Sequence, residues 1–243
     1  MIPEQTVIKN LFDNYKQQRT FTRVHEERIR ALLQGVMFPN RELKLLPKLD
    51  ARELSSRDIG EELFAAGLAN DSVERVVQAM ERIRRLSKWY ENQADRKRPS
   101  ELEIVAHMIT PLMLGLGWSE QLMPIEWNRV DIAFFNRPPV SEKDYDNCTM
   151  VCETKGRGSS LEPAYKQAKA YIESLPLKNC TRIVTTDGGR LFLYKWHDTS
   201  WPDVLDPIGY VNLASIRKEN VFPFGTSGVD TLIELIPWNV MRP

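Results

Sequence analysis

The sequence predicts a mixed α/β protein, in which an all-helical N-terminal domain over residues 1–98 precedes an α/β domain over residues 99–243. Three observations support this prediction. Apolar residues recur at helical spacing through the first hundred residues, as they do in amphipathic helices. They then gather into short apolar runs, typical of buried strands, on both sides of a helical stretch. The polar, charged run 92–99 between the two parts ends in proline and indicates a domain boundary.

The composition excludes several classes of protein. Lys plus Arg number 33 and Asp plus Glu also number 33, so any nucleic-acid site is local rather than a property of the whole charge. The three cysteines contain no C-x-x-C pair, which disfavours a disulfide framework and a zinc knuckle. The sequence has no apolar run near the roughly 20 residues that span a bilayer, and its start does not resemble a signal peptide. We therefore expect a cytoplasmic protein without a membrane partner.

Helices are expected in the first part over residues 4–34, over about 55–68 with Ser55 or Ser56 as N-cap, and again after Asn70-Asp71. The outward face of the last of these helices carries basic residues, namely Arg75, Arg82, Arg84, Arg85 and Lys88. Glutamates interleave with them, so a solvated helix face is favoured over a nucleic-acid footprint.

The second part is predicted in the order helix, three strands, helix, two strands. The expected elements are a helix from Ser100 to about residue 117, strands at 122–127, 130–135 and 150–155, a helix at 161–175, a hairpin with strands 182–186 and 190–195, and a tail with a short strand and one or two helices. Ser100 and Glu103 have the spacing of a capping box at the first helix, as do Ser159 and Glu162 at the second.

Charged residues interrupt two of these apolar strands. Because side chains alternate along a strand, Glu153 and Lys155 share one face, and Asp131 lies on the neighbouring strand. A charge in a buried strand is costly unless it is paired or bound to a metal. Helical spacing places Glu101 on the apolar side of the helix that begins at Ser100. These four charged side chains are therefore candidates for one site.

The glycine loop after the third strand does not fit a nucleotide-binding motif. In Gly156-Arg157-Gly158 the third glycine of a dinucleotide fingerprint would fall at Leu161, and no G-x-x-x-x-G-K-[ST] occurs in the sequence. We interpret the glycines as a sharp turn beside the charged residues, where Arg157 is a candidate for a phosphate contact.

Asp131 followed by Glu153-Thr154-Lys155, with Glu101 before them and Gln167 and Tyr171 after them, resembles the PD-(D/E)xK nuclease superfamily. More closely, the region is similar to the N-terminal nuclease domain of type I restriction enzyme R subunits, also at Leu-Gly-Trp 116–118 and at the hairpin 184–190. The resemblance covers about residues 100–196 and departs at Val130, where the superfamily usually has proline. It implies a restriction-endonuclease-like αβββαβ core with a central mixed sheet.

The resemblance also implies the chemistry of the site. Asp131, Glu153 and the Thr154 carbonyl would bind Mg²⁺, with Mn²⁺ as a substitute, and Glu101 would assist directly or through water. Lys155 would position or deprotonate the attacking water, or offset the developing charge. Gln167 would orient the lysine or the attacking group. The residues expected to contact DNA are Arg129, Arg157 and Lys169.

The expected function is a metal-dependent endodeoxyribonuclease of a restriction-modification or related defence system. DNA is the expected partner. A separate motor or methyltransferase/specificity subunit is a further candidate because the sequence has no ATPase motif, and a homodimer stays open. Two alternatives remain on the same fold: a non-cleaving nucleic-acid-binding or assembly module, and a structure-specific repair or junction nuclease. Taken singly, each residue also has a structural interpretation: Glu153 and Lys155 as a partly exposed pair on an edge strand, and Asp131 as an acid next to a turn.

Overall fold

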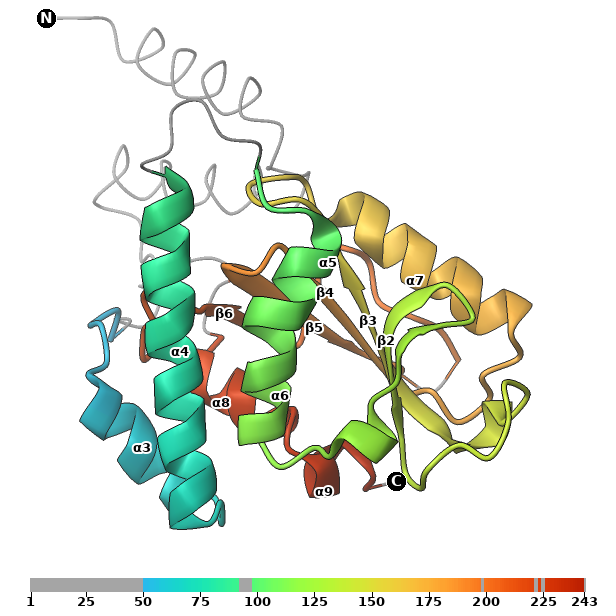
Figure 1. The fold of residues 1–243 in the computed structure, drawn as a ribbon, viewed down its shortest axis with the longest axis horizontal. Helices are drawn as coiled ribbons and strands as arrows, with labels where there is room; N and C mark the ends of the chain where they lie inside the picture. Colours follow the sequence, from blue (N-terminus) through green and yellow to red (C-terminus); the bar gives the residue numbers. More distant parts are fainter. Residues whose placement is uncertain (1–49, 92–97, 198, 221–222, 224–225, 243) are drawn as a thin grey trace, which may run out of the picture. The chain divides into compact units, whose positions relative to one another are not determined.

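A computed structural model of the protein describes residues 50–91, 98–197, 199–220, 223 and 226–242 (Figure 1). These residues belong to one compact unit, Leu49–Pro243. The helices expected over residues 4–34 lie outside the described residues, as does most of the polar run 92–99. The helices that follow are α3 (Ser56–Ala65), α4 (Asn70–Glu91), α5 (Glu101–Ile104), α6 (Thr110–Gly115), α7 (Glu162–Ser174), α8 (Gly228–Glu234) and α9 (Pro237–Val240).

Six strands form one mixed sheet in the order in which they follow in the chain. They are β1 (Ile125–Trp127), β2 (Val130–Phe135), β3 (Cys148–Thr154), β4 (Arg182–Thr186), β5 (Arg190–Lys195) and β6 (Gly209–Asn212). β3 and β4 are parallel, and the other neighbouring strands pair antiparallel. A parallel pair needs a crossover connection, which α7 supplies. The predicted mixed α/β class is confirmed, whereas the restriction-endonuclease-like core stays a prediction.

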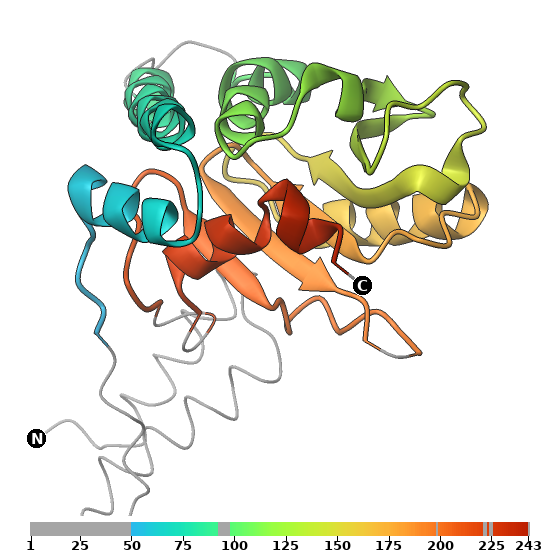
Figure 2. The same cartoon turned by 90° about the horizontal axis from the view of Figure 1, so that it is seen from below.

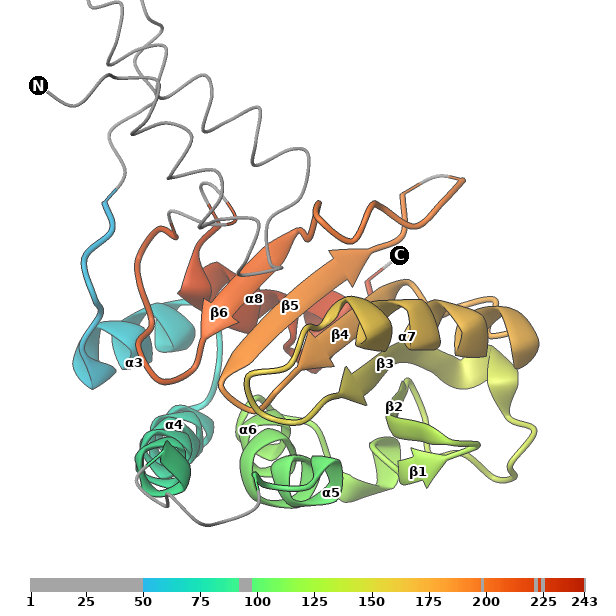
Figure 3. The same cartoon turned by 90° about the horizontal axis from the view of Figure 1, so that it is seen from above.

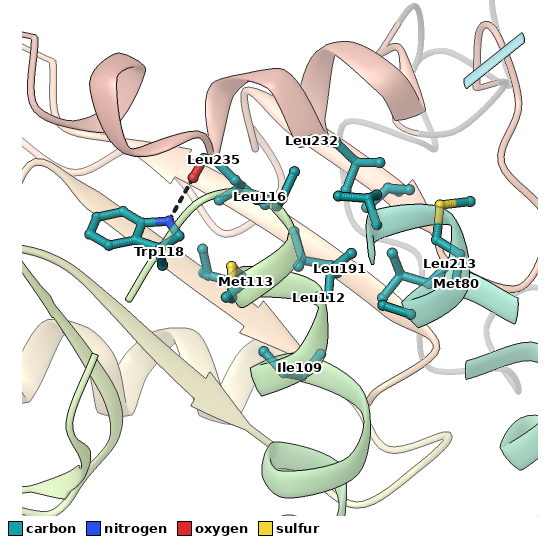
Figure 4. Close-up of a cluster of buried hydrophobic side chains, with 14 of the residues drawn as sticks. Met80, Ile109, Leu112, Met113, Leu116, Trp118, Leu191, Leu213, Leu232 and Leu235 are labelled. Carbon is teal, nitrogen blue, oxygen red and sulfur yellow. Dashed lines mark hydrogen bonds between the residues drawn. The ribbon is translucent and has the colours of Figure 1, made fainter. Parts of the chain in front are cut away.

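The two faces of the sheet bury separate apolar clusters because side chains alternate along each strand. One cluster joins Val151, Ile183 and Tyr194 of the sheet to Ala168 of α7. The other lies beneath α5, α6 and α8 (Figure 3). Figure 4 shows its centre, where the Trp118 Nε1–H donates a 2.9 Å hydrogen bond to the Leu235 carbonyl. The sheet is therefore covered on both sides, and its charged residues need an explanation.

Helices α3 and α4 belong to the second of these clusters. Val76 and Ile83 of α4 are fully buried in it together with Ile109 and Leu112. Contact with α6 is so close that a Cβ added at Gly115 would come within 2.9 Å of the Val76 nitrogen. Figure 2 shows α3 beside α8. Among the described residues, α3 and α4 therefore share a hydrophobic core with the α/β part of the chain, while the domain division predicted at residues 98–99 stays a prediction.

The helix expected from Ser100 changes its geometry in the middle. Between α5 and α6 lies η1, a π-helical segment over Val105–Ile109, in which the Thr110 N–H donates to the Val105 carbonyl. Pro111 follows directly; it has no N–H, and its ring would crowd the carbonyl four residues earlier in an α-helix. The wider π turn before the proline relieves that conflict and lets the helix continue.

Local signals predicted several ends of elements correctly. Ser55 caps α3 and Ser100 caps α5, each in a capping box. The β1–β2 turn at Asn128-Arg129 is confirmed, and both residues have positive φ as a two-residue hairpin turn requires.

Two local predictions are wrong. The capping box expected at Ser159 and Glu162 is absent, because α7 begins only at Glu162 with Leu161 as its N-cap and no side-chain cap. The first strand is also shorter than expected, because Glu120–Leu122 form a 3-10 turn, η2. Among the described helices, none is long and apolar enough to cross a membrane.

Candidate active site

Asp131 and Glu153 lie side by side on the antiparallel strands β2 and β3. The register pairs Ile132 with Cys152, so the two acids are the next residues facing each other across the strands. The Asp131 N–H donates to Glu153 Oε1 at 3.4 Å, and the Thr154 N–H donates to Asp131 Oδ2 at 2.6 Å. The hydrogen bonds of the strand ends therefore hold both carboxylates in place.

Of the two acids, Glu153 has the more strongly raised pKa. The residue is fully buried, and its Oε2 has no hydrogen-bond partner among the described residues. Burial raises the pKa of Glu153 to about 8, and the neighbouring Asp131 carboxylate adds to the rise. Burial also raises the pKa of Asp131, against the hydrogen bond from Thr154 and the charge of Lys155. A buried, unsatisfied carboxylate beside a second acid is costly for a purely structural role.

Lys155 and Glu101 complete a group of four charged side chains. The Lys155 Nζ lies 3.6 Å from Glu101 Oε2, and the two side chains are 18% and 46% exposed. Glu101 is therefore not buried, although it lies at the start of a helix whose apolar face is. It is available for Lys155 because Glu103 serves the capping box with Ser100. The Lys155 Nζ also donates to the Thr154 carbonyl at 2.9 Å.

The local backbone explains why these side chains meet at one end of the sheet. The Lys155 N–H donates to the Thr186 carbonyl at 2.9 Å, which continues the parallel β3–β4 ladder one residue past the end of β3. In Figure 1, α5 begins at this same end of the sheet. Lys155 pairs with Glu101, and its charge acts on both Asp131 and Glu153. The group therefore has three acids for one base, a formal excess of negative charge that a cation would offset.

The donor set fits Mg²⁺ in part. Among the described residues, no three His, Cys, Asp or Glu side chains converge in the way that would hold a metal ion by themselves. Mg²⁺ does not require such a cage, since it keeps several waters and is usually bound by one or two carboxylates together with substrate phosphates. Asp131 and Glu153, whose Oε2 no described residue contacts by a hydrogen bond, supply such a pair of carboxylates. The Thr154 carbonyl, predicted as a further ligand, accepts from Lys155 instead.

The contacts that the structure gives for Gln167 and Lys169 are with residues outside this group. The Gln167 amide on α7 donates to the Tyr171 hydroxyl at 2.9 Å, and within the described chain its hydrogen bond goes there and not to the charged residues. Lys169 lies over the Tyr165 ring, 5.6 Å from its centroid. Arg129 is exposed in the β1–β2 turn. The structure thus brings together Glu101, Asp131, Glu153 and Lys155 but not Gln167.

The sequence does not predict a set of hydrogen bonds that joins the β4–β5 turn to the loop after Lys155. Asp187, in the turn between β4 and β5, accepts from the Gly158 N–H at 3.0 Å and from Arg190 Nη2 at 2.6 Å. Arg190 Nη2 also donates to the Ser159 carbonyl at 2.8 Å. These bonds hold the loop after Lys155. The Asp-Gly-Gly-Arg turn predicts the hairpin but not the loop that the turn binds. Gly158 in that loop and Asp187 in the turn are 29 residues apart in the sequence.

The fold and the site define a mixed α/β protein with two facing carboxylates, one of them fully buried, and a lysine at a strand end. Comparisons with models of protein families, with curated proteins and with solved structures gave no match. Membership of the PD-(D/E)xK superfamily therefore stays a proposal, and the case for a function depends on the chemistry of these four residues.

Proposed function

We propose that this protein is a Mg²⁺-dependent endodeoxyribonuclease of the PD-(D/E)xK type, which hydrolyses phosphodiester bonds of DNA in a restriction or related defence system. One observation carries the proposal. Glu153 is a fully buried carboxylate whose Oε2 has no hydrogen-bond partner in the described part of the chain, and it faces a second carboxylate, two residues before a lysine. Two facing carboxylates are unfavourable while both are charged, so the pair holds either a proton or a cation, and perturbed acids of this kind gather at functional sites.

Asp131 and Glu153 are the residues that would hold the metal ion. Bound Mg²⁺ lowers the pKa of a coordinated water and offsets negative charge on the phosphoryl group. The raised pKa of Glu153 supports this assignment, because a cation beside the carboxylate returns it to its charged form. Metal binding would therefore release a proton from this acid near neutral pH.

Lys155 is the residue placed to act on the attacking water or on the phosphate. Its Nζ is held from two sides, by the Thr154 carbonyl at 2.9 Å and by Glu101 at 3.6 Å. The side chain is 18% exposed, so it reaches solvent while its charge stays partly desolvated. A fixed ammonium group can orient a water and stabilise negative charge as it develops on the phosphate. Glu101 acts as the positioning residue for this lysine.

Nicking of supercoiled plasmid in Mg²⁺ or Mn²⁺ tests the proposal. We expect Asp131→Asn and Lys155→Ala each to lower the rate about 100-fold or more, because each removes a group that acts in the transition state. The matched controls are Asp206→Asn and Lys178→Ala, which change the same residue types at exposed positions away from the site. Equal nicking by all five proteins would refute the assignment of the site.

Two other outcomes would select the alternatives on the same fold. Salt-dependent DNA binding without cleavage in either metal would indicate a non-cleaving binding module, since phosphate contacts weaken steeply with ionic strength. Preferential cleavage of branched over linear duplex would indicate a repair or junction nuclease. Adding a candidate motor or specificity subunit to the same assay tests whether cleavage needs a partner.

A further inference from the structure

A cavity of about 460 Å³ has a lining that includes none of the four charged residues and has no part in the proposed reaction. Its lining includes three arginines from three segments: Arg98 before α5, Arg157 in the loop after β3, and Arg190 at the start of β5. Figure 1 shows the end of α4, the start of α5 and this loop at the same end of the molecule. Arg157 follows Lys155 by two residues, so one segment of the chain contributes both to the candidate active site and to the cavity.

The Arg157 guanidinium is held rigidly at the wall of this cavity. Its side chain is 17% exposed, and its Nη1 packs so closely over Gly189 that a Cβ there would come within 2.6 Å of it. A larger residue at position 189 would force the guanidinium to move. Arg98 Nη1 donates to the Arg157 carbonyl at 3.3 Å, which ties the two residues together. A preorganised arginine loses little freedom when it binds a ligand.

Each of the two carboxylates at the cavity is tied to one of the arginines. Asp187 is 3% exposed and is tied to Arg190, at 2.6 Å, and to the backbone of the hairpin turn, so it is structural. Glu91 pairs with Arg157 Nη2 at 2.8 Å, but its side chain is 66% exposed. It is also the last residue of α4, where the helix dipole disfavours a negative charge. Because the Glu91 side of the pair is open to solvent, water screens the interaction there and a competing anion can reach the arginine. Glu91 is therefore a replaceable counter-ion.

We infer that this cavity binds a phosphate group of a nucleic-acid strand, and that Glu91 competes with the phosphate for Arg157. Arginine forks match phosphate oxygens in geometry and charge. The volume accommodates a phosphate with its attached nucleoside. The inference rests on the proposed function and deepens it by assigning a strand contact to the segment that follows Lys155. It does not require cleavage, so binding measured in EDTA can succeed where the nicking assay fails.

The test measures binding of a short single-stranded oligonucleotide with a 5′-phosphate, in EDTA at fixed salt. The same oligonucleotide with a 5′-hydroxyl, and inorganic phosphate as competitor, distinguish a terminal phosphate, a backbone phosphate and a free ion. We compare wild type with Arg157→Gln and Glu91→Gln. The controls are Glu81→Gln, an exposed acid on the same helix, and Arg57→Gln, an exposed arginine on α3.

Arg157→Gln should weaken binding about tenfold, the usual effect of losing a charge-assisted hydrogen bond. Glu91→Gln should strengthen binding about two- to fivefold, because it removes the exposed carboxylate that competes with the phosphate for Arg157. Glu81→Gln and Arg57→Gln should leave affinity within twofold of wild type, roughly the effect of a distant screened charge. Equal affinities for all proteins, or the same gain from Glu91→Gln and Glu81→Gln, would overturn the inference. If Arg157→Gln fails to fold, exposed Arg98→Gln provides the loss-of-binding arm.

Discussion

Replacing Glu153 with glutamine removes the buried charge and keeps the oxygen that accepts from the Asp131 N–H. In the folded protein the pKa of Glu153 is about 8, against an ordinary value of 4.5. Between these values the folded protein holds a proton that the unfolded chain has released. The wild type therefore loses stability as pH rises from 4.5 towards 8, by about 1.36 kcal/mol for each pH unit.

The variant escapes this loss because glutamine does not titrate. At pH 7, which is 2.5 units above 4.5, Glu153→Gln should raise the free energy of unfolding by about 3 kcal/mol relative to its effect at pH 4. At pH 5 the same difference should be below about 1 kcal/mol. Urea denaturation of both proteins across this pH range measures it, with exposed Glu142→Gln as the control. If the difference in the free energy of unfolding between the two proteins does not change with pH, Glu153 is not a buried acid with a raised pKa.

The same region yields two further predictions. In a thermal shift assay, Mg²⁺ should raise the unfolding temperature of the wild type more at pH 8 than at pH 5, because protons compete with the metal for Glu153. The Glu153→Gln variant should lose most of this gain in unfolding temperature. An equal gain in both proteins would exclude Glu153 as a metal ligand. Gly188→Ala should lower the free energy of unfolding by about 2–4 kcal/mol, because at φ +80° its Cβ collides with Met108 Sδ and comes within 2.8 Å of Ile104 Cγ2. The control Gly158→Ala has φ +76° but nothing within 4 Å, and it should cost only about 1 kcal/mol in the same urea titration; similar losses from both substitutions would contradict the packing argument.

Local chemistry explains the features that could be predicted from the sequence. The β1–β2 and β4–β5 hairpins depend on their turn residues, and Gly188 supplies the positive φ that the second turn needs. Strand alternation was sufficient to place Glu153 and Lys155 at one strand end. The pairing of Asp131 with Glu153 then results from the hairpin-like order of β2 and β3. The roles of these residues in catalysis stay predictions.

Long-range packing explains the features that could not be predicted. Arg157 was expected to contact a phosphate, but its partner Glu91 is 66 residues away in the sequence, and no local pattern connects them. Gln167 was placed in the site by resemblance, whereas its helix directs the amide to Tyr171, one turn along. The polar run 92–99 indicates a linker, yet it carries no information on whether α3 and α4 pack against the α/β part of the chain.

The shared core of α3 and α4 has a consequence for engineering. A fragment that begins at residue 99 would expose the apolar surface of α6 that Val76 and Ile83 cover, and it would lose the backbone contact at Gly115. Such a fragment is expected to aggregate rather than to act as a portable catalytic module. Transfer of the four charged residues to another protein would therefore have to include residues 50–91, because these share one hydrophobic core with the elements that carry the charged residues.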